Sequence, residues 1–527
     1  MRLYAVLVLG AVIAAITLTA CAPAPARRSA APVTLVVSLN GDPGALNPAV
    51  TTSGNTHPVT DQIFNGLVGL DENLSPVPEL AERWTIEDDG RAYRFALRQH
   101  VTWHDGAPFT SADVKFTFEN ALLKYHSRTR AALQDLVQAI ETPDDHTVVF
   151  RLQRPYSPLL QRLDVVEASI IPKHLYDGKD LLTGEPTRRP VGTGPFRFVS
   201  YAPADRVVLE RNPTYFRPGL PGVDRLVFRI MPTAGTAVAA LEKGEIDYVG
   251  GVAGPEVERL RKTPGIAVVS GTGGSGGSVC EDVLIPNLAH RPLGDIRVRR
   301  AIAMAIDRQF IVDRVYFGQG RPATGPISHL LAWAYTPEVR QYPHDPEWAM
   351  RLLDEAGLKP HADGERLAIT FTHASTQQRL GQALREQLKA VGITLNLQTV
   401  DFNAAVEQVF VKKNFDLGMA SFCNGADPDI GVRRVYVSSN IGPFPFSNGA
   451  GYRNQRVDEL FDEASRLQDR TERRARYVEI QKLLAEDVPY FWIIDSEGLR
   501  AYRTAFTGFR LWTGAFVETV RRAGAGQ

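Results

Sequence analysis

Few groups of residues in this chain have the types and spacing that catalysis requires. Trp103-His104-Asp105-Gly106 contains an adjacent His and Asp, but Asp-Gly is strong turn chemistry, so we interpret it as a turn before a helix that begins near Ser111. The glycine-rich run 271–278 has the composition of a phosphate-binding loop but lacks its Lys-Ser/Thr ending, and we predict a flexible loop. No G-x-S-x-G, H-E-x-x-H or P-loop motif is present, and the 11 histidines are scattered. We therefore predict that the chain is not an enzyme and holds no metal and no cofactor.

Residues 1–32 have the pattern of an export signal. Arg2 precedes an uncharged apolar run over 3–20, and the segment after Cys21 is rich in Ala and Pro. Leu18-Thr19-Ala20-Cys21 resembles a bacterial lipobox, in which the Cys thiol is acylated and becomes the mature N-terminus. We predict a signal peptide over 1–20 and a lipidated tether over 21–32. The alternative is a transmembrane anchor, since about 18 apolar residues can just span a bilayer, but the prolines after Cys21 favour cleavage.

Cys280 and Cys423 are the two cysteines that remain after Cys21. An exported chain meets an oxidising compartment, where an even number of cysteines suggests a disulfide. The alternative is two separate buried thiols, and the residues alone favour neither.

The composition is that of a globular protein with an ordinary surface. The chain has 527 residues, 44% of them hydrophobic, which is enough for two or three compact units. Lys+Arg and Asp+Glu are both 59, so bulk charge does not attract the chain to nucleic acid or to anionic lipid. We therefore predict no nucleic-acid partner.

Predicted strands and helices alternate along the chain. We predict strands over 33–37, 91–98, 147–152, 207–210, 393–397 and 490–494, and helices over 111–120, 232–241, 296–316, 380–391 and 471–486. Ser111 can cap the first of these helices, and Gly244 can close the second. The helix at 380–391 carries Leu380, Leu384, Leu388 and Val391 on one stripe, and Gly392 can end it. This alternation predicts α/β architecture.

Several stretches of the chain follow one another in the order found in a known protein family. They are 80–84, 89–90, 93–98, 103–106, 112–114, 192–196, 295–308 and 427–429. Together they resemble the peptide/opine/nickel class, family 5, of bacterial extracellular solute-binding proteins, the lipoprotein components of ABC importers. Gly192-Thr193-Gly194-Pro195-Phe196 is similar to the family's crossover strand between lobes, and Asp427-Pro428-Asp429 is similar to its late binding loop.

The resemblance implies an α/β, two-lobed periplasmic-binding-protein fold, type II-like and of the large cluster, with an extra third subdomain. The implied division is lobe I over 33–60, 191–279 and 488–520, the extra subdomain over 61–190, and lobe II over 280–487. A ligand would bind between the lobes and be enclosed by hinge closure. A separate ABC permease and ATPase would perform import, since this chain has no P-loop, and the chain would act as a monomer.

The resemblance also bears on the cysteines. Oligopeptide-binding members have two bonded cysteines in places that match Cys280 and Cys423, so it implies a disulfide between them. Such a bond would bring the two Cα atoms within roughly 4.4–6.8 Å of each other.

We expect the ligand to contact short residues in loops. These are Gly54 and Asn55 on the lobe I side, and Asn424, Gly425 and Asp427 on the lobe II side. Glycine and small polar residues in loops after strands let backbone groups approach a ligand closely. The expected ligand is peptide-like or opine-like.

One departure from the family pattern affects the ligand. Peptide binders place an Asp near the start of the late loop to pair with the peptide ammonium, and Asn424 or Gly425 stands at that position here. A buried ammonium without a carboxylate is costly, so we expect weak binding of free-amine peptides unless Asp427 substitutes. Arg433 and Arg434 would favour an anionic ligand if either faces the cleft; the alternative is two solvated helix-surface arginines.

Two rival functions stay open. A secreted hydrolase would need a nucleophile or a metal constellation, and turnover of peptides or esters by the pure protein would reveal it. A nickel or haem binder would share the same fold, and stabilisation by metal would separate it from a binder of organic solutes.

The lipobox can be tested by replacing its cysteine. We predict that the mature protein begins at lipid-modified Cys21 and fractionates with membranes, whereas Cys21→Ser stays unprocessed or is released. Acyl chains anchor because each buried methylene contributes about 0.8 kcal/mol. Mass spectrometry of the mature N-terminus and membrane fractionation provide the measurement, and an unmodified Cys21 in wild-type membranes would contradict the prediction.

Overall fold

The computed structural model of the protein describes residues 32–252, 254, 256–270, 280–512 and 514–524. The chain divides into two compact units, Met1–Val33 and Thr34–Gln527, and every element below belongs to the second. Cys21 and the glycine-rich run 271–278 lie outside the described residues. None of the helices in the described ranges combines the length and the apolar character that crossing a membrane requires.

A mixed seven-stranded sheet contains the first strand of the described chain. Its order is β12-β19-β11-β1-β10-β9-β8. The strands are β1 (Thr34–Leu39), β8 (Phe196–Ala202), β9 (Arg206–Arg211), β10 (Arg225–Ile230), β11 (Tyr248–Val249), β12 (Ile266–Ser270) and β19 (Leu499–Arg503). Two helices, α6 (Ala234–Lys243) and α7 (Glu256–Arg261), contribute to its core. Gly244 ends α6 in the left-handed region (φ 75°), as predicted.

A second, six-stranded sheet is built from the later part of the chain. Its order is β14-β18-β13-β17-β15-β16. The strands are β13 (Cys280–Pro286), β14 (Gly320–Pro322), β15 (Leu367–Ala374), β16 (Ile393–Val400), β17 (Leu417–Cys423) and β18 (Phe491–Ser496). The helices of this region are α8 (Ile296–Ala305), α9 (Arg308–Arg314), α10 (Pro346–Glu355), α11 (Gln378–Lys389), α12 (Phe402–Val406), α13 (Pro428–Gly431), α14 (Arg433–Tyr436), α15 (Gln455–Arg466) and α16 (Arg470–Asp487).

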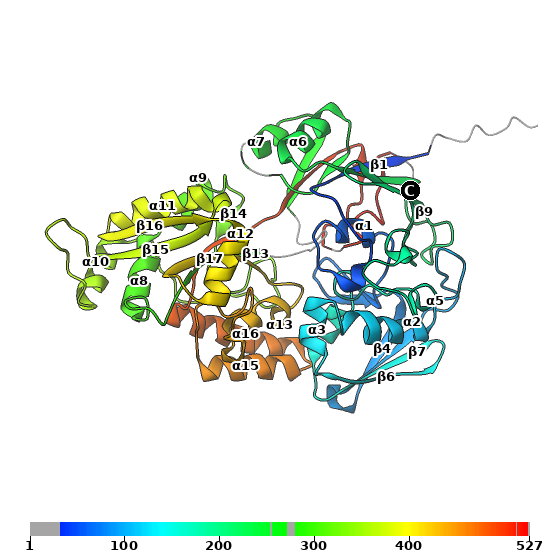
Figure 1. The fold of residues 1–527 in the computed structure, drawn as a ribbon, viewed down its shortest axis with the longest axis horizontal. Helices are drawn as coiled ribbons and strands as arrows, with labels where there is room; N and C mark the ends of the chain where they lie inside the picture. The colour runs from blue at the N-terminus through cyan, green and yellow to red at the C-terminus, as the bar shows by residue number, and fades with distance from the viewer. Residues whose placement is uncertain (1–31, 253, 255, 271–279, 513, 525–527) are drawn as a thin grey trace, which may run out of the picture. The chain divides into compact units, whose positions relative to one another are not determined.

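Helix α11 joins the parallel strands β15 and β16 and lies along them (Figure 1). Leu380, Leu384 and Leu388 are each at most 1% exposed, so the predicted stripe is the buried face of this helix. Gly392 follows with φ 83°, which a residue with a Cβ adopts only at a cost. The periodic pattern therefore located both the helix and its packing face.

The segment 61–190 contains a four-stranded antiparallel sheet of order β4-β5-β7-β6. Its elements are β4 (Ala81–Glu87), β5 (Ala92–Leu97), β6 (Val137–Asp144), β7 (Thr147–Leu152), α2 (Ser111–Phe116), α3 (Ser127–Leu133), α4 (Val165–Ala168) and α5 (Lys173–Tyr176), drawn in blue to cyan-green in Figure 1. Phe150 packs edge-on against Phe95 and Phe118, with ring centroids 5.8 and 4.9 Å away. Further short elements of the second unit are α1 (His57–Thr60), β2 (Val68–Leu70), β3 (Pro76–Pro78), β20 (Phe506–Thr507) and β21 (Arg521–Arg522).

Two helix predictions were wrong in detail. The predicted helix 296–316 is two helices, because the side chain of Asp307 accepts a hydrogen bond from the Phe310 N–H (2.9 Å) and so begins α9. The cap of α2 is Thr110 and not Ser111, and the Asp113 carboxylate accepts a hydrogen bond from the Thr110 N–H at 2.9 Å. Both differences come from short polar residues that bind backbone donors.

The segment 192–196 does not cross between the two large sheets, so that prediction was wrong. It leads from the segment 61–190 into β8, and the Gly194 N–H donates to the Ile63 carbonyl at 2.7 Å. A Cβ at Gly192 would lie 1.9 Å from that same carbonyl oxygen, so only glycine fits. His104 in the predicted turn contacts the Gly194 carbonyl through Nε2 (3.0 Å), a structural role.

The chain passes between the seven-stranded and six-stranded sheets twice, from β12 to β13 and from β18 to β19. Residues 488–520 were expected in lobe I, but β18 pairs with β13 and β14 in the six-stranded sheet. The second crossing therefore follows Ser496. The apolar run 490–494, which precedes this crossing, carries no sequence signal that tells which sheet its strand joins.

Cys280 and Cys423 are direct neighbours on the antiparallel strands β13 and β17. Their sulfur atoms are 1.98 Å apart and their Cα atoms 3.9 Å apart, which is closer than the expected range. Directly opposed residues of an antiparallel pair lie close even without a bond, at about 4.5 Å in the narrow pairs. The register of the two strands thus brings the cysteines together.

The redox state of this pair is a testable prediction. We predict that the exported protein, denatured without a reductant, has no titratable thiol at Cys280 or Cys423. Reduction should release two thiols and lower the free energy of unfolding by about 2–4 kcal/mol, because the cross-link restricts the unfolded chain. Two free thiols in the unreduced protein would contradict the disulfide.

Candidate functional site

A cavity of about 850 Å³ lies within the second unit and is lined by three parts of the chain. Thr52, Trp512 and Gly514 form one part, residues of 70–167 form a second, and residues of 423–447 form the third. Small-molecule sites usually have volumes of roughly 300–1,000 Å³. The cavity can therefore hold a small organic molecule or a short peptide.

The wall contributed by 70–167 contains a network of charged groups, in which Arg162 and Glu167 are buried and Arg128 is exposed. Arg162 donates from Nε to the Tyr156 hydroxyl (2.8 Å), and Arg128 Nε lies 3.0 Å from the Glu167 carboxylate. Arg162 Nη1 lies 3.9 Å from the other Glu167 oxygen. Burial acts to raise the pKa of Glu167, but Arg128 and Arg162 outweigh it and lower this pKa. Glu167 is therefore ionised and shared between two guanidinium groups.

The opposite wall comes from the loop after β17 and from α13 and α14. Asp429 accepts a hydrogen bond from the Tyr156 hydroxyl at 3.0 Å, so this contact joins the two walls. The guanidinium of Arg433 lies 3.5 Å from Asp429 and also forms a short ion pair with Asp462. Asp429 and Arg433 thus neutralise each other.

Arg434 differs from its neighbour. Its side chain lines the cavity, is half-buried, and donates from Nε to the Gly431 carbonyl at 3.3 Å. The guanidinium carbon lies 6.0 Å from the centroid of the Phe422 ring. Burial, and after it the charge of Arg128, lowers the pKa of Arg434. Within the described part of the chain no carboxylate lies at ion-pair distance from Arg434.

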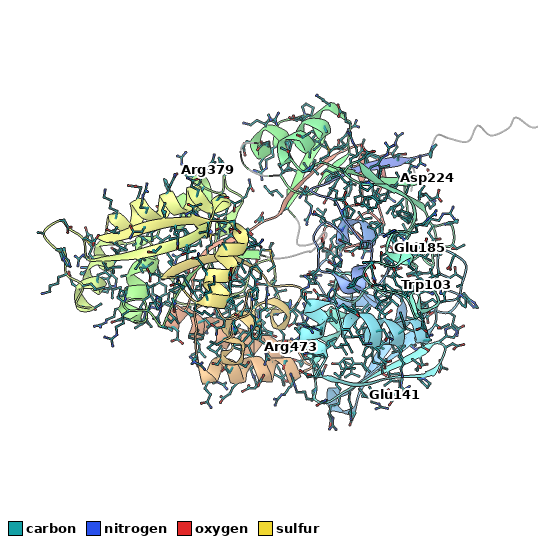
Figure 2. The ribbon with its side chains drawn as sticks, in the orientation of Figure 1. Trp103, Glu141, Glu185, Asp224, Arg379 and Arg473 are labelled. Carbon is teal, nitrogen blue, oxygen red and sulfur yellow. A yellow bond between two sulfur atoms is a disulfide. The ribbon has the colours of Figure 1, made fainter. Side chains whose placement is uncertain are left out.

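Asp427 does not contact the cavity, and its assignment as a ligand contact is corrected. The side chain is 0% exposed, and its carboxylate lies 2.8 Å from Nη1 of Arg473 on α16, labelled in Figure 2. The same carboxylate accepts a hydrogen bond from the Asp429 N–H at 3.0 Å and so begins α13. A carboxylate held by a buried arginine and by a helix N-terminus is not free for an ammonium ion.

The structure brings only one of the other four predicted contacts to the cavity. Gly425 lines it, with φ 66°. Asn424 is 1% exposed and lies beside Glu281. Burial and the charge of Asp495 raise the pKa of Glu281, and Asn424 acts to lower it. Gly54 and Asn55 are not among the described residues that line the cavity.

The N-terminal loop reaches the cavity through Thr52 and not through Gly54 or Asn55. Asn55 packs on Gly41, where a Cβ would lie 2.6 Å from the Asn55 amide nitrogen. Its side chain is therefore used to hold the loop.

Sequence reasoning missed the whole wall formed by 70–167. A signal does exist, because Arg162, Asp164 and Glu167 stand in the otherwise uncharged and mostly apolar stretch 156–172. Charged residues are almost never fully buried unless they are paired. Arg128 and Trp512 have no comparable local signal.

Asp164 lines the cavity at the N-terminus of α4, and it is 7% exposed. Its carboxylate accepts a hydrogen bond from the Glu167 N–H at 3.0 Å. Burial, followed by the charge of Glu167, raises the pKa of Asp164 to about 7. At neutral pH this carboxyl group is therefore about half protonated.

Comparison with known proteins identifies the family. The model of the bacterial extracellular solute-binding proteins, family 5 Middle, matches residues 75–443. The chain belongs to this family. It is 29% identical to di/tripeptide-binding protein 2 of Pseudomonas aeruginosa, over 92% of this chain and 93% of the relative. It is 28% identical to the glutathione-binding protein GsiB of Salmonella typhi, over 90% of this chain and 91% of the relative.

A solved structure agrees with the family assignment. The periplasmic binding protein DppA of Helicobacter pylori, in complex with the peptide STSA, is similar with a TM-score of 0.76 and 25% identity, over 93% of this chain and 98% of the other. The predicted two-lobed α/β periplasmic-binding-protein fold is thereby confirmed. Among the residues that the structure describes, no group of three or more His, Cys, Asp or Glu is placed to hold a metal ion.

The raised pKa of Asp164 predicts a pH-dependent stability. Because the folded-state pKa is about 7 and the ordinary value is 3.8, the folded protein binds the proton more tightly, and its stability falls as pH rises from about 4 to 7. Asp164→Asn keeps a helix-capping side chain and removes the charge. We predict that the variant exceeds the wild type in free energy of unfolding by roughly 2–4 kcal/mol at pH 8 and by little at pH 4.

Denaturant unfolding of both proteins at the two pH values gives the difference directly. The exposed Asp145→Asn is the control, and its effect should be the same at both pH values. A difference between Asp164→Asn and wild type that does not change with pH would contradict the assignment.

Proposed function

We propose that the chain is an extracytoplasmic solute-binding lipoprotein. In this proposal it captures a peptide-like or opine-like solute in the cavity and delivers it to an ABC-type permease, without turning the solute over. The observation that carries the proposal is the cavity of about 850 Å³, which is lined from both sides by residues distant in sequence. Membership of family 5 supports a binding role, and two relatives are named for the peptides or glutathione that they bind.

The proposed capture step is a hinge closure around the solute. In chain order, the described strands pass from one large sheet to the other after β12 and again after β18. Because few chain segments link the two sheets, each sheet can move as a rigid body relative to the other. For this reason we propose that lobe II extends through Ser496, that lobe I resumes after it, and that 61–190 is the extra subdomain.

The proposed solute lacks a free ammonium group at the late loop. Asp427 is committed to Arg473, and Asp429 to Arg433 and Tyr156. An ammonium ion placed against either would compete with an existing buried partner. N-blocked peptides and opine-like conjugates therefore suit the cavity better than free-amine peptides.

The proposed delivery step requires partners outside this chain. Lipidation at Cys21 and a tether over 21–32 would hold a monomer near the membrane, where a permease and an ATPase would receive the solute. Support for this step comes from the family and from the lipobox-like tetrad.

The function can be tested on protein purified from its native host. Mass spectrometry after denaturation should release one organic solute in near-stoichiometric amount. Ala131→Trp on α3, which puts a bulky ring on the cavity wall, should release at least tenfold less. Arg130→Trp on the same helix lies outside the cavity and should release as much as wild type. Equal release from the Ala131→Trp variant, or turnover of the released solute by the protein, would contradict the proposal.

A further inference from the structure

We propose that the solute carries a carboxylate that binds between Arg434 and Arg128, and that this contact selects anionic solutes. This inference rests on the proposed function, because it names the ligand class of the same cavity. Two groups from opposite walls carry it. Arg434 belongs to α14, and Arg128 belongs to α3.

The charges around the cavity do not balance. Five arginines and three carboxylates line it. Arg433 is neutralised by Asp429 and Asp462. Glu167 is shared by Arg128 and Arg162, so one carboxylate serves two guanidinium groups. Arg154 and Arg434 line the cavity without an ion pair to any described carboxylate, so the cavity wall carries an excess of positive charge.

Unlike Arg154, which also lacks an ion pair among the described residues but is exposed, Arg434 keeps an unpaired charge partly away from solvent. It is half-buried, and its side-chain contacts are one backbone carbonyl and one aromatic ring. Neither contact neutralises a charge. After burial, the charge of Arg128 lowers the pKa of Arg434, the charge of Glu167 raises it and the charge of Arg162 lowers it, so these three groups lie within electrostatic reach of Arg434 and two of them are cations. An anion between the walls would relieve this repulsion.

A carboxylate on an organic body fits the cavity better than an inorganic anion does. The planar guanidinium fork of an arginine matches the two oxygens of a carboxylate. The cavity is also lined by Leu70, Ile430, Val437, Phe446 and Trp512, which offer apolar surface to an organic body. Inorganic anions would leave that surface wet. An organic acid satisfies both features at once.

The contact would also couple binding to closure. Arg128 comes from the segment 61–190 and Arg434 from the region of the six-stranded sheet. A single carboxylate bound by both groups joins the two walls, as the Tyr156–Asp429 hydrogen bond (3.0 Å) does elsewhere in the cavity. A neutral solute would lack the carboxylate that links Arg128 to Arg434.

Isothermal titration with two matched pairs of probes tests the inference. The pairs are N-acetyl-dialanine with its carboxamide, and N-acetyl-glutathione with its diethyl ester. We expect at least one acid to bind roughly tenfold or more tighter than its uncharged partner, as a charge-assisted hydrogen bond implies. Arg434→Gln should remove that preference, and Arg434→Lys should restore part of it. Inorganic phosphate should compete weakly.

Two controls separate the contact from general effects. Arg130→Gln on α3 does not touch the cavity and should keep the wild-type preference. Arg434→Gln should unfold at the wild-type temperature, because in the described structure this arginine has no ion pair to lose. Equal affinities within both pairs, an unchanged preference in Arg434→Gln, or failure of both acids to bind would overturn the inference. The proposed function is judged separately by the solute released from the native protein, so the two failures are distinguishable.

Discussion

The cost of burying charge organises the cavity and the elements around it. A buried charge left without a partner destabilises a protein by several kcal/mol, and the carboxylates near the late loop are accordingly paired from within. Asp427 lies 2.8 Å from Arg473 and also begins α13, so the direction of this helix depends on the pair. Asp429 is held by Arg433 and Tyr156. What remains unpaired among the described arginines of the cavity is the charge of the half-buried Arg434 and of the exposed Arg154.

This arrangement explains how one family fold can serve different solutes. The sheets and helices hold the walls, while the charge offered to the solute depends on a few side chains. Here the position expected to hold an ammonium-pairing Asp is Asn424 or Gly425, and Asn424 is buried beside Glu281. A carboxylate introduced at Asn424 would lie next to another buried carboxyl group. The late loop therefore favours a solute without a free ammonium.

Much of the fold was predictable because its signals are local. The strand over 147–152 and the stripe of Leu380, Leu384 and Leu388 follow from periodicity alone. The helix predicted over 296–316 failed where Asp307 accepts a backbone hydrogen bond and starts a new helix. The site was less predictable. Gly425 was expected at the cavity and lines it, but Arg128 and Arg434 line the same cavity only because the fold brings distant segments of the chain to it. No local pattern tells which of two adjacent arginines, Arg433 or Arg434, is neutralised.

The central claim is that an anionic group of the solute sits between the two arginine-bearing walls. The most direct test is a crystal structure of the wild-type protein with the solute that it carries from its native host. The account predicts carboxylate oxygens about 2.7–2.9 Å from the guanidinium of Arg434, on the side that faces Arg128. A solute whose ammonium pairs with Asp429 or Asp427, with Arg434 turned to solvent, would contradict it.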